Sequence, residues 1–266
     1  MILKKLFIKY KSDKHIHKYD LVYDQYFTKL KNKKLTILEI GVSDGSSLKA
    51  WSNYFRKSTI VGIDIKKIDI FKKKLNKKNI FVHQGSQTDN KFINKIIKIY
   101  KKFDIIIDDG SHFPKDVIKS FKLLFHSLDK NGLYFVEDTQ TSYNHFLGGN
   151  AFDLKYANTH VNFFKHLTDS LNYKEIANPF YLKNGYDGLI KNISFFNNII
   201  VILKGKNDNK SNEVLDNSYE KKRFITKIKR NNQSVKYFVK YKIFYSLYTL
   251  FLFFFSFLKK IILFRS

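Results

Sequence analysis

The sequence predicts an α/β fold in which a mostly parallel sheet ends in an antiparallel hairpin. Short apolar runs alternate with amphipathic segments along the chain, which is typical of strand–helix–strand units with a parallel sheet. Several apolar runs end in acidic or glycine-containing loops, as expected where ligands bind beyond the carboxyl ends of parallel strands. The last two apolar runs, Ile193–Phe196 and Ile199–Leu203, are separated only by Asn197 and Asn198, which indicates a hairpin.

Composition limits the classes of protein to be considered. A chain of 266 residues can hold one sizeable α/β domain and an appendage. The absence of cysteine excludes disulfides and thiolate metal sites, and it suits a reducing compartment. The formal net charge of +26 arises mainly from lysine. It is compatible with a nucleic-acid or anionic-membrane partner, but a general lysine and asparagine bias explains it as well.

Two helices are expected before the sheet. Residues 2–10 place apolar side chains on one helical face, and lysines interrupt the run, so an amphipathic helix is expected rather than a secretory signal. An aromatic-rich helix is expected over about Tyr19–Leu30. Between them, His15 and His17 lie in a polar loop, where histidines are more often solvated than metal-bound.

The first two strands and their loops predict a nucleotide-like site. Leu35–Ile40 is expected to be a buried strand, followed by Gly41 and by a helix over about Ser46–Phe55. A strand, a glycine-containing turn and a helix start together bring backbone N–H groups close to a ligand. Thr59–Ile63 is the second expected strand and ends in Asp64, a carboxylate that can accept from both hydroxyls of a ribose.

The alternation continues through three more strands. Ile80–His83 is expected to be a strand, followed by a polar turn and a helix over about Asn90–Tyr100. The most informative stretch is Phe103–His112, in which a buried strand runs into two carboxylates, a glycine, a serine and a histidine. Apolar residues then recur at helical spacing over Val117–Leu128, and Gly132–Val136 is the fifth expected strand.

Acidic side chains follow two of these strands. Asp108 and Asp109 end the fourth strand, and Glu137 and Asp138 follow the fifth. Successive strands are usually neighbours, so these carboxylates and His112 are expected to converge. Like charges so close would repel one another without a cation, and carboxylates without cysteine favour Mg²⁺ or Ca²⁺ over zinc. The alternative is that the first pair caps a helix and the second lies in a solvated loop.

The loop after the first strand favours S-adenosylmethionine (SAM) over a dinucleotide. Dinucleotide sites usually contain G-x-G-x-x-G, whereas this loop reads EIGVSDG and lacks the third glycine. Glu39 can bind the cationic end of a methionine group but would repel a pyrophosphate. Five strand–helix units closed by an antiparallel hairpin also suit the SAM methyltransferases.

Motifs along most of the chain carry a more specific resemblance. They extend from about residue 12 to residue 205 and read SDKH with YDQYF, LEIGVSDGSSLKAW, VGIDI, FDIIIDDGSH, GLYFVEDTQTSY and ISFFNNIIVILKG. With them, the chain resembles the metal-dependent sugar O-methyltransferases of the mycinamicin/macrolide type and related bacterial glycan methyltransferases. The resemblance implies a class I SAM-methyltransferase Rossmann-like sheet, with SAM and Mg²⁺ as cofactors.

The resemblance also implies roles for individual residues. Asp109, Glu137 and Asp138 are expected to bind Mg²⁺, and His112 is expected to be the general base. Gln140 and Tyr143 are candidate sugar contacts. The residues expected to contact SAM, by their own chemistry or by their place in the motifs, are Glu39, Gly41, Asp64, Ser86, Gln87 and Asp108.

The expected function is methyl transfer to a sugar hydroxyl of a bacterial glycan or glycoconjugate precursor. The metal would lower the pKa of the hydroxyl, His112 would accept its proton, and the oxygen would attack the sulfonium methyl group. The alternative is a membrane-associated, non-catalytic SAM-fold binding or scaffold subunit. Only the charge suggests a nucleic-acid methyltransferase, so no nucleic-acid partner is expected.

The remaining segments are interpreted as a lid, a linker and a tail. Residues 1–205 are expected to form the methyltransferase domain, with 139–178 as a substrate lid. A polar and then basic linker is expected over 206–240, and a hydrophobic, membrane-associated helix over 241–266. Its uncharged part, Ile243–Leu258, is short for a span, and the alternative is a helix packed on the protein or on a second copy in a homo-oligomer. The expected location is cytoplasmic, peripheral on the inner face of the cell membrane.

Overall fold

The computed structural model divides the chain into two compact units. One comprises Met1–Leu171 and Tyr186–Asp208, and the other comprises Asn172–Gly185 and Asn209–Ser266. The structure describes residues 2–66, 78–176, 181–207 and, in the C-terminal tail, residues 247, 248, 250–252 and 254. The first unit contains the sheet and the candidate site.

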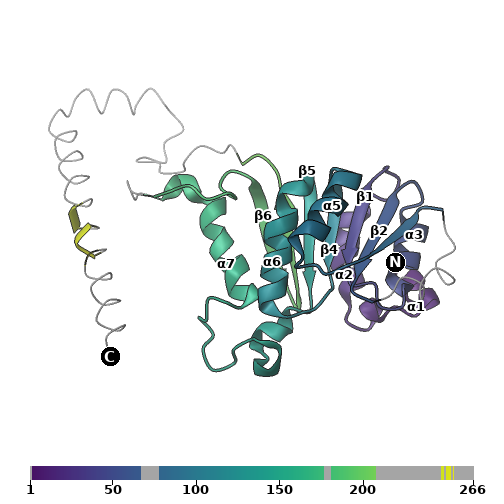
Figure 1. Cartoon of the computed structure of the whole chain (residues 1–266), viewed down its shortest axis with the longest axis horizontal. Coiled ribbons are helices and arrows are strands. Elements are labelled where there is room, and N and C mark those ends of the chain that lie inside the picture. Colours follow the sequence, from purple (N-terminus) through teal and green to yellow (C-terminus); the bar gives the residue numbers. More distant parts are fainter. Residues whose placement is uncertain are drawn as a thin grey trace, which may run out of the picture. The chain divides into compact units, whose positions relative to one another are not determined.

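The described part of the first unit contains a seven-stranded sheet (Figure 1). The strand order is β3-β2-β1-β4-β5-β7-β6. Neighbours from β3 to β5 are parallel, whereas β7 is antiparallel to both β5 and β6. The predicted mostly parallel sheet with an antiparallel C-terminal hairpin is therefore confirmed. The strands are β1 (Thr36–Ile40), β2 (Thr59–Asp64), β3 (Ile80–Gln84), β4 (Phe103–Asp108), β5 (Leu128–Glu137), β6 (Ile190–Phe196) and β7 (Ile199–Lys204).

Helices pack on both faces of this sheet because successive strand residues point to opposite sides. In β4, Ile105 and Ile107 join a core with α1, α2 and α3, whereas Ile106 joins a second core with α5, α6 and α7. The helices themselves are labelled in Figure 1. The α-helices are α1 (Ile2–Tyr10), α2 (Tyr19–Phe27), α3 (Ser46–Tyr54), α5 (Asn90–Tyr100), α6 (Pro114–Leu124) and α7 (His160–Leu171). The 3₁₀ turns are η1 (Asp13–His15), η2 (Phe125–Ser127), η3 (Thr139–Tyr143), η4 (His145–Leu147) and η5 (Tyr173–Glu175).

The boundary between α6 and β5 differs from the sequence prediction. The helix expected over Val117–Leu128 ends at Leu124, and β5 begins at Leu128 instead of Gly132. Leu128 is buried and pairs with Phe103 of β4, so pairing across the sheet overrides the helical spacing there.

The strand order reverses between β1 and β4, and the loops that follow these strands approach closely. The sequence continues outward from β1 to β2 and β3 on one side, and from β4 to β5 on the other. Gly41 follows β1 with φ +86°, and a Cβ there would lie 2.0 Å from the carbonyl oxygen of Asp109. Any larger residue would therefore separate the two loops. A crevice at such a reversal is where open α/β sheets bind ligands.

The predicted linker and tail lie mostly outside the described residues. Within the described ranges, none of the helices combines the length and the apolar character needed to cross a bilayer. The described tail residues are helical, and their side chains include exposed leucine and phenylalanine. The membrane association of 241–266 stays a prediction.

Candidate active site

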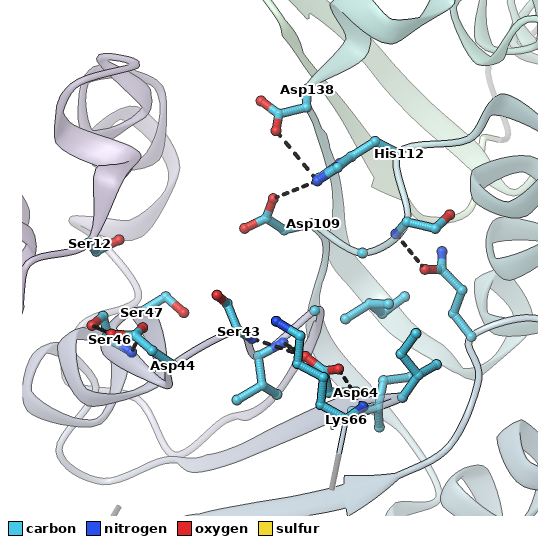
Figure 2. Close-up of a pocket in the computed structure, with 18 of the residues that line it drawn as sticks. Ser12, Ser43, Asp44, Ser46, Ser47, Asp64, Lys66, Asp109, His112 and Asp138 are labelled. Carbon is cyan, nitrogen blue, oxygen red and sulfur yellow. Dashed lines mark hydrogen bonds and ion pairs between the residues drawn. The ribbon is translucent and has the colours of Figure 1, made fainter. Parts of the chain in front are cut away.

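A cavity of about 650 Å³ opens at the carboxyl ends of β1, β2, β3, β4 and β5. Its lining comes from the loops after these strands and from the segment Lys11–Lys14 that leads into η1. Figure 2 shows Ser43 and Asp64 in one part of the cavity and the acidic group around Asp109 in another. The cavity thus joins the predicted SAM loop to the predicted metal loop.

Asp64 orients the loop after β1. One oxygen, Oδ2, accepts from the backbone N–H groups of Val42 at 2.8 Å and Ser43 at 3.0 Å. The other, Oδ1, accepts from the N–H of Lys66 at 2.8 Å. A carboxylate offers about four lone-pair positions, so it can still accept from a ligand hydroxyl. Asp64 and Gly41 both line the cavity, where they were expected to contact SAM.

Gln87 connects the loop after β3 to the loop after β4. Its Nε2 donates to Asp108 Oδ1 at 3.2 Å and to Ser120 Oγ at 3.2 Å. Its Oε1 accepts from the backbone N–H of Ser111 at 2.8 Å. Gln87 and Ser86 line the cavity, as expected for residues near SAM.

We expect Gln87→Ala to lower the free energy of unfolding by about 1–3 kcal/mol. The substitution removes a hydrogen-bond donor to the buried Asp108 carboxylate and the acceptor for the Ser111 N–H. Urea denaturation measures the loss of stability. Gln84→Ala is the matched control, since Gln84 is exposed and makes one long hydrogen bond of 3.5 Å to a backbone carbonyl. Equal losses in the two variants would show that Gln87 does not brace the loop.

Asp108 is buried and is not among the residues that line the cavity. Its side chain faces α6 and accepts hydrogen bonds from Ser120 and Tyr134. Burial raises the pKa of Asp108 to about 6, and the hydrogen bonds from Ser120 and Tyr134 oppose that rise. The contact of Asp108 with SAM stays a prediction, and Asp108 is connected to the cavity lining through Gln87.

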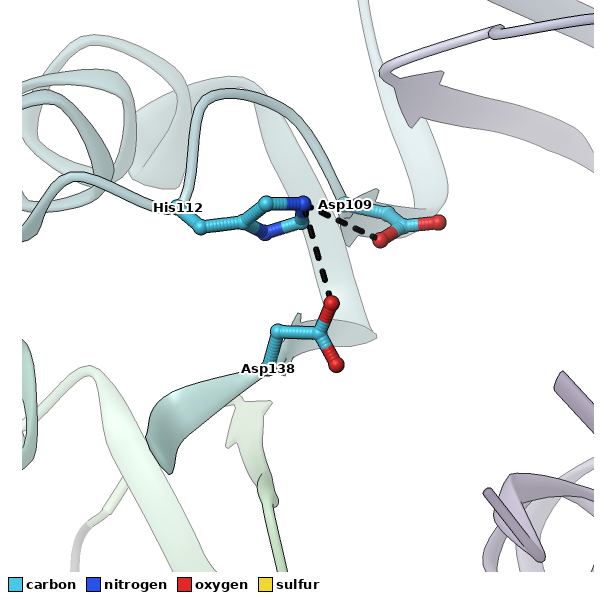
Figure 3. A group of neighbouring side chains, drawn as sticks. All are labelled: Asp109, His112 and Asp138. Carbon is cyan, nitrogen blue, oxygen red and sulfur yellow. Dashed lines mark ion pairs between the residues drawn. The ribbon is translucent and has the colours of Figure 1, made fainter. Parts of the chain in front are cut away.

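Three of the predicted site residues lie together on the cavity wall (Figure 3). Asp109, His112 and Asp138 each place one ligand atom within 4.8 Å of the others. His112 Nε2 lies 3.6 Å from Asp138 Oδ2 and 4.0 Å from Asp109 Oδ1. All three side chains are partly exposed, so a ligand in the cavity can reach them.

The backbone on both sides of this group is held in an uncommon conformation. His112 has φ +59° and Asp138 has φ +52°. The hydroxyl of Thr141 donates to the carbonyl of His112 at 2.8 Å, and the phenol of Tyr19 donates to Asp138 Oδ1 at 2.7 Å. Burial raises the pKa of Tyr19, which keeps the phenol a hydrogen-bond donor. These contacts hold the strained conformations that direct both side chains to one point.

Glu137 and Glu39 occupy a different environment from Asp138. Lys14 Nζ donates to Glu137 at 2.8 and 2.7 Å, and the phenol of Tyr23 also donates to Glu137. Glu39 is fully buried, accepts from Ser47 at 2.8 Å and lies 3.4 Å from Lys14 Nζ. Burial and the Asp109 charge raise the pKa of Glu137, whereas Lys14 lowers it.

The predicted roles of these two glutamates, Glu137 as a metal ligand and Glu39 as a SAM contact, stay predictions. Glu137 is held by Lys14 and Tyr23, apart from the group that Asp109 and Asp138 form with His112. Glu39 is absent from the cavity lining, where a contact with SAM would be expected. Sequence reasoning did not indicate the contact of Lys14 with these carboxylates, and the only signal for Lys14 was its place in the SDKH motif.

The site nevertheless suits a hard divalent cation. Four carboxylates, Glu39, Asp109, Glu137 and Asp138, cluster at the strand ends, and Lys14 is the one lysine within ion-pair distance of them among the described residues. The remaining negative charge favours a cation, and the oxygens of Asp109 and Asp138 are the donors that Mg²⁺ prefers.

The segment after β5 lies beside this group. Gln140 and Tyr143 are exposed on η3, and neither lines the cavity, so their predicted contacts with a sugar remain a prediction. Phe146 and Phe152 are also exposed, at 92% and 94%. Residues 177 and 178 of the predicted lid lie outside the described residues.

The burial of His160 predicts that the stability of the fold depends on pH. His160 is fully buried at the start of α7, and burial lowers its pKa from 6.5 to about 4. Between these values the unfolded chain binds more protons than the folded chain, so stability falls as the pH drops. We expect a loss of about 2 kcal/mol between pH 7 and pH 5 that is absent in His160→Gln. Urea denaturation at both pH values measures it, and His166→Gln, at an exposed position of α7, should keep the wild-type loss.

Comparison with known proteins gives a consistent set of relatives. A family model described as FtsJ-like methyltransferase matches residues 14–179. Mycinamicin VI 2''-O-methyltransferase of Micromonospora griseorubida is 33% identical over 73% of this chain and 49% of its own length. Demethylmacrocin O-methyltransferase of Streptomyces fradiae is 32% identical over 72% of this chain and 50% of its own length. The chain thus spans about half the length of the curated relatives it matches.

A solved structure supports the same relationship. It is the MycE methyltransferase from the mycinamycin biosynthetic pathway in complex with Mg, SAH and mycinamycin VI. The TM-score is 0.74 at 30% identity, and the match covers 82% of this chain and 57% of the other. The sheet described above is therefore that of the class I SAM methyltransferases.

Proposed function

Since the chain belongs to the FtsJ-like methyltransferase family, we propose that it is a SAM-dependent and Mg²⁺-dependent O-methyltransferase that acts on a sugar hydroxyl. The observation that carries this proposal is the group of Asp109, His112 and Asp138 on the wall of the cavity. The names of the relatives support a sugar hydroxyl as the acceptor.

The cavity offers separate positions for the methyl donor and the metal. The backbone from Gly41 to Ser43, held by Asp64, would bind SAM through N–H groups and the remaining lone pair of the carboxylate. Asp109 and Asp138 would hold Mg²⁺, with Glu137 as a predicted third ligand. When bound, the metal supplies positive charge that lowers the pKa of the acceptor hydroxyl.

His112 is placed to move the proton. Its Nε2 faces the space between Asp109 and Asp138, so it can accept the hydroxyl proton as the acceptor oxygen bonds to the methyl carbon. The bond between that carbon and sulfur breaks, and S-adenosylhomocysteine (SAH) leaves. The two carboxylates stabilise the imidazolium that forms.

We place the acceptor among bacterial glycan or glycoconjugate precursors. The predicted basic linker and hydrophobic tail support a location on the inner face of the cell membrane, where a lipid-linked acceptor would be reached. The exposed side chains of Tyr143, Phe146 and Phe152, on the segment that follows β5, support an acceptor with an apolar part.

The test is SAH production by the full chain with SAM and a panel of rhamnosides and other glycosides. We expect turnover that requires a glycoside, stops with EDTA and returns with Mg²⁺. Turnover that EDTA leaves intact would contradict the metal-dependent mechanism. SAM binding without turnover on any glycoside would favour a non-catalytic SAM-fold subunit.

A further inference from the structure

Lys14 is a buried cation between three strand ends. Its Nζ lies 2.6 Å from Asp109, 2.7 and 2.8 Å from the two oxygens of Glu137, and 3.4 Å from Glu39. The side chain is 2% exposed. A lysine ammonium has three N–H donors, and the Asp109 and Glu137 oxygens accept from all three. Lys14 thus connects the ends of β1, β4 and β5 through a single charged group.

Lys14 also fixes the segment that covers one side of the cavity. Ser12, Asp13 and Lys14 all line the cavity, and Ser12 is buried. The N–H of Ser12 donates to the carbonyl of Phe7 at 2.9 Å, and His15 Nδ1 lies 2.6 Å from the carbonyl of Ser12. These contacts are local, whereas Lys14 is the residue of the segment that reaches the strand ends carrying the acidic group.

Asp109 takes part both in the contacts of Lys14 and in the acidic group with His112. Its Oδ2 accepts from Lys14, while its Oδ1 faces His112 on the side where a metal is expected. The positive charge on Lys14 therefore offsets part of the negative charge that attracts a divalent cation to this carboxylate. The same contact keeps residues 12–14 beside the SAM loop.

We propose that Lys14 is a positioning residue with two opposite effects on ligand affinity. It strengthens SAM binding by holding residues 12–14 against the cavity, and it weakens divalent-cation binding by placing a fixed positive charge among the carboxylates. This inference rests on the proposed function, because it takes the cavity to bind SAM and the acidic group to bind a metal.

The test is the affinity of the full-length Lys14→Met variant for two probes, measured without acceptor. The first probe is SAH, which lacks the sulfonium charge, and its dissociation constant should rise at least about fivefold as the segment loses its closed position. The second is Mn²⁺, whose free concentration is read by electron paramagnetic resonance. Its dissociation constant should fall at least about fivefold as the competing charge is removed.

A second variant separates charge from position. Lys14→Met/Glu39→Gln has the same net charge in the cluster as the wild type, because one positive and one negative group are lost together. We expect Mn²⁺ affinity within about twofold of the wild type, while SAH binding remains weak. Lys5→Met, an exposed position on α1, is the matched control and should change neither affinity.

The outcomes distinguish the inference from the proposed function. A parallel loss of both affinities in Lys14→Met, or no change in either, would overturn the inference alone, provided that the wild type binds SAH and Mn²⁺. A wild type that binds neither probe would overturn the proposed function as well. If circular dichroism shows that Lys14→Met is unfolded, the comparison is made between Glu39→Gln and Lys14→Met/Glu39→Gln. The double variant should then bind Mn²⁺ more tightly, and SAH more weakly, than Glu39→Gln does.

Discussion

Replacing Asp109 with asparagine is expected to lower kcat/KM for methyl transfer at least about 10³-fold and to remove its dependence on Mg²⁺. Asp109 is the residue shared by the acidic group with His112 and by the contact with Lys14. An amide keeps the shape of the side chain but removes the charge that would attract the cation, which is worth several kcal/mol in such sites. Rates of SAH formation across a Mg²⁺ titration measure the effect.

The matched control for this variant is Asp169→Asn on α7. Asp169 is exposed and lies outside the acidic group, so it loses the same charge without touching the site. It should retain the wild-type rate and Mg²⁺ dependence. A wild-type Mg²⁺ dependence in Asp109→Asn would show that the cation is bound elsewhere.

Replacing His112 with glutamine is expected to lower kcat about 10²–10⁴-fold, the usual contribution of a general base. Glutamine can accept a hydrogen bond at this position but cannot take up the hydroxyl proton. Mn²⁺ binding should persist, because the carboxylates of Asp109 and Asp138 remain. Single-turnover kinetics with bound SAM would locate the loss in the chemical step.

His166→Gln is the control for the histidine variant. His166 is exposed on α7, and its replacement should leave the rate of methyl transfer unchanged. If His112→Gln kept the wild-type rate constant in a single turnover, proton transfer would have to be assigned to another group.

Much of the fold follows from the sequence because its signals are local. Apolar runs of strand length, separated by amphipathic segments, identify the central strands, and the Asn197–Asn198 turn identifies the hairpin. The start of β5 could not be read in this way. Leu128 continues a helical spacing in the sequence, but its partner is Phe103 of β4, which lies far away in the chain.

Side chains alternate between the two faces of a strand, and this explains why the acidic residues at the strand ends point to different faces of the sheet. Glu39 and Glu137 point to the same face as Ile37 and Phe135, toward α2 and α3, where they meet Lys14, Tyr23 and Ser47. Asp108 points to the opposite face and meets Ser120. Asp109 and Asp138 follow the ends of their strands, so their loops are free to direct them into the cavity.

The sequence by itself determined the sheet, the family and the residues that gather at the strand ends, because periodicity and motifs are written in neighbouring positions. Only the tertiary structure decided which carboxylates contact Lys14 and which face the cavity. Lys14 is 95 residues from Asp109 and 123 from Glu137 in the chain. Contacts over such distances leave no periodic trace in the sequence, since they depend on how separate elements pack against one another.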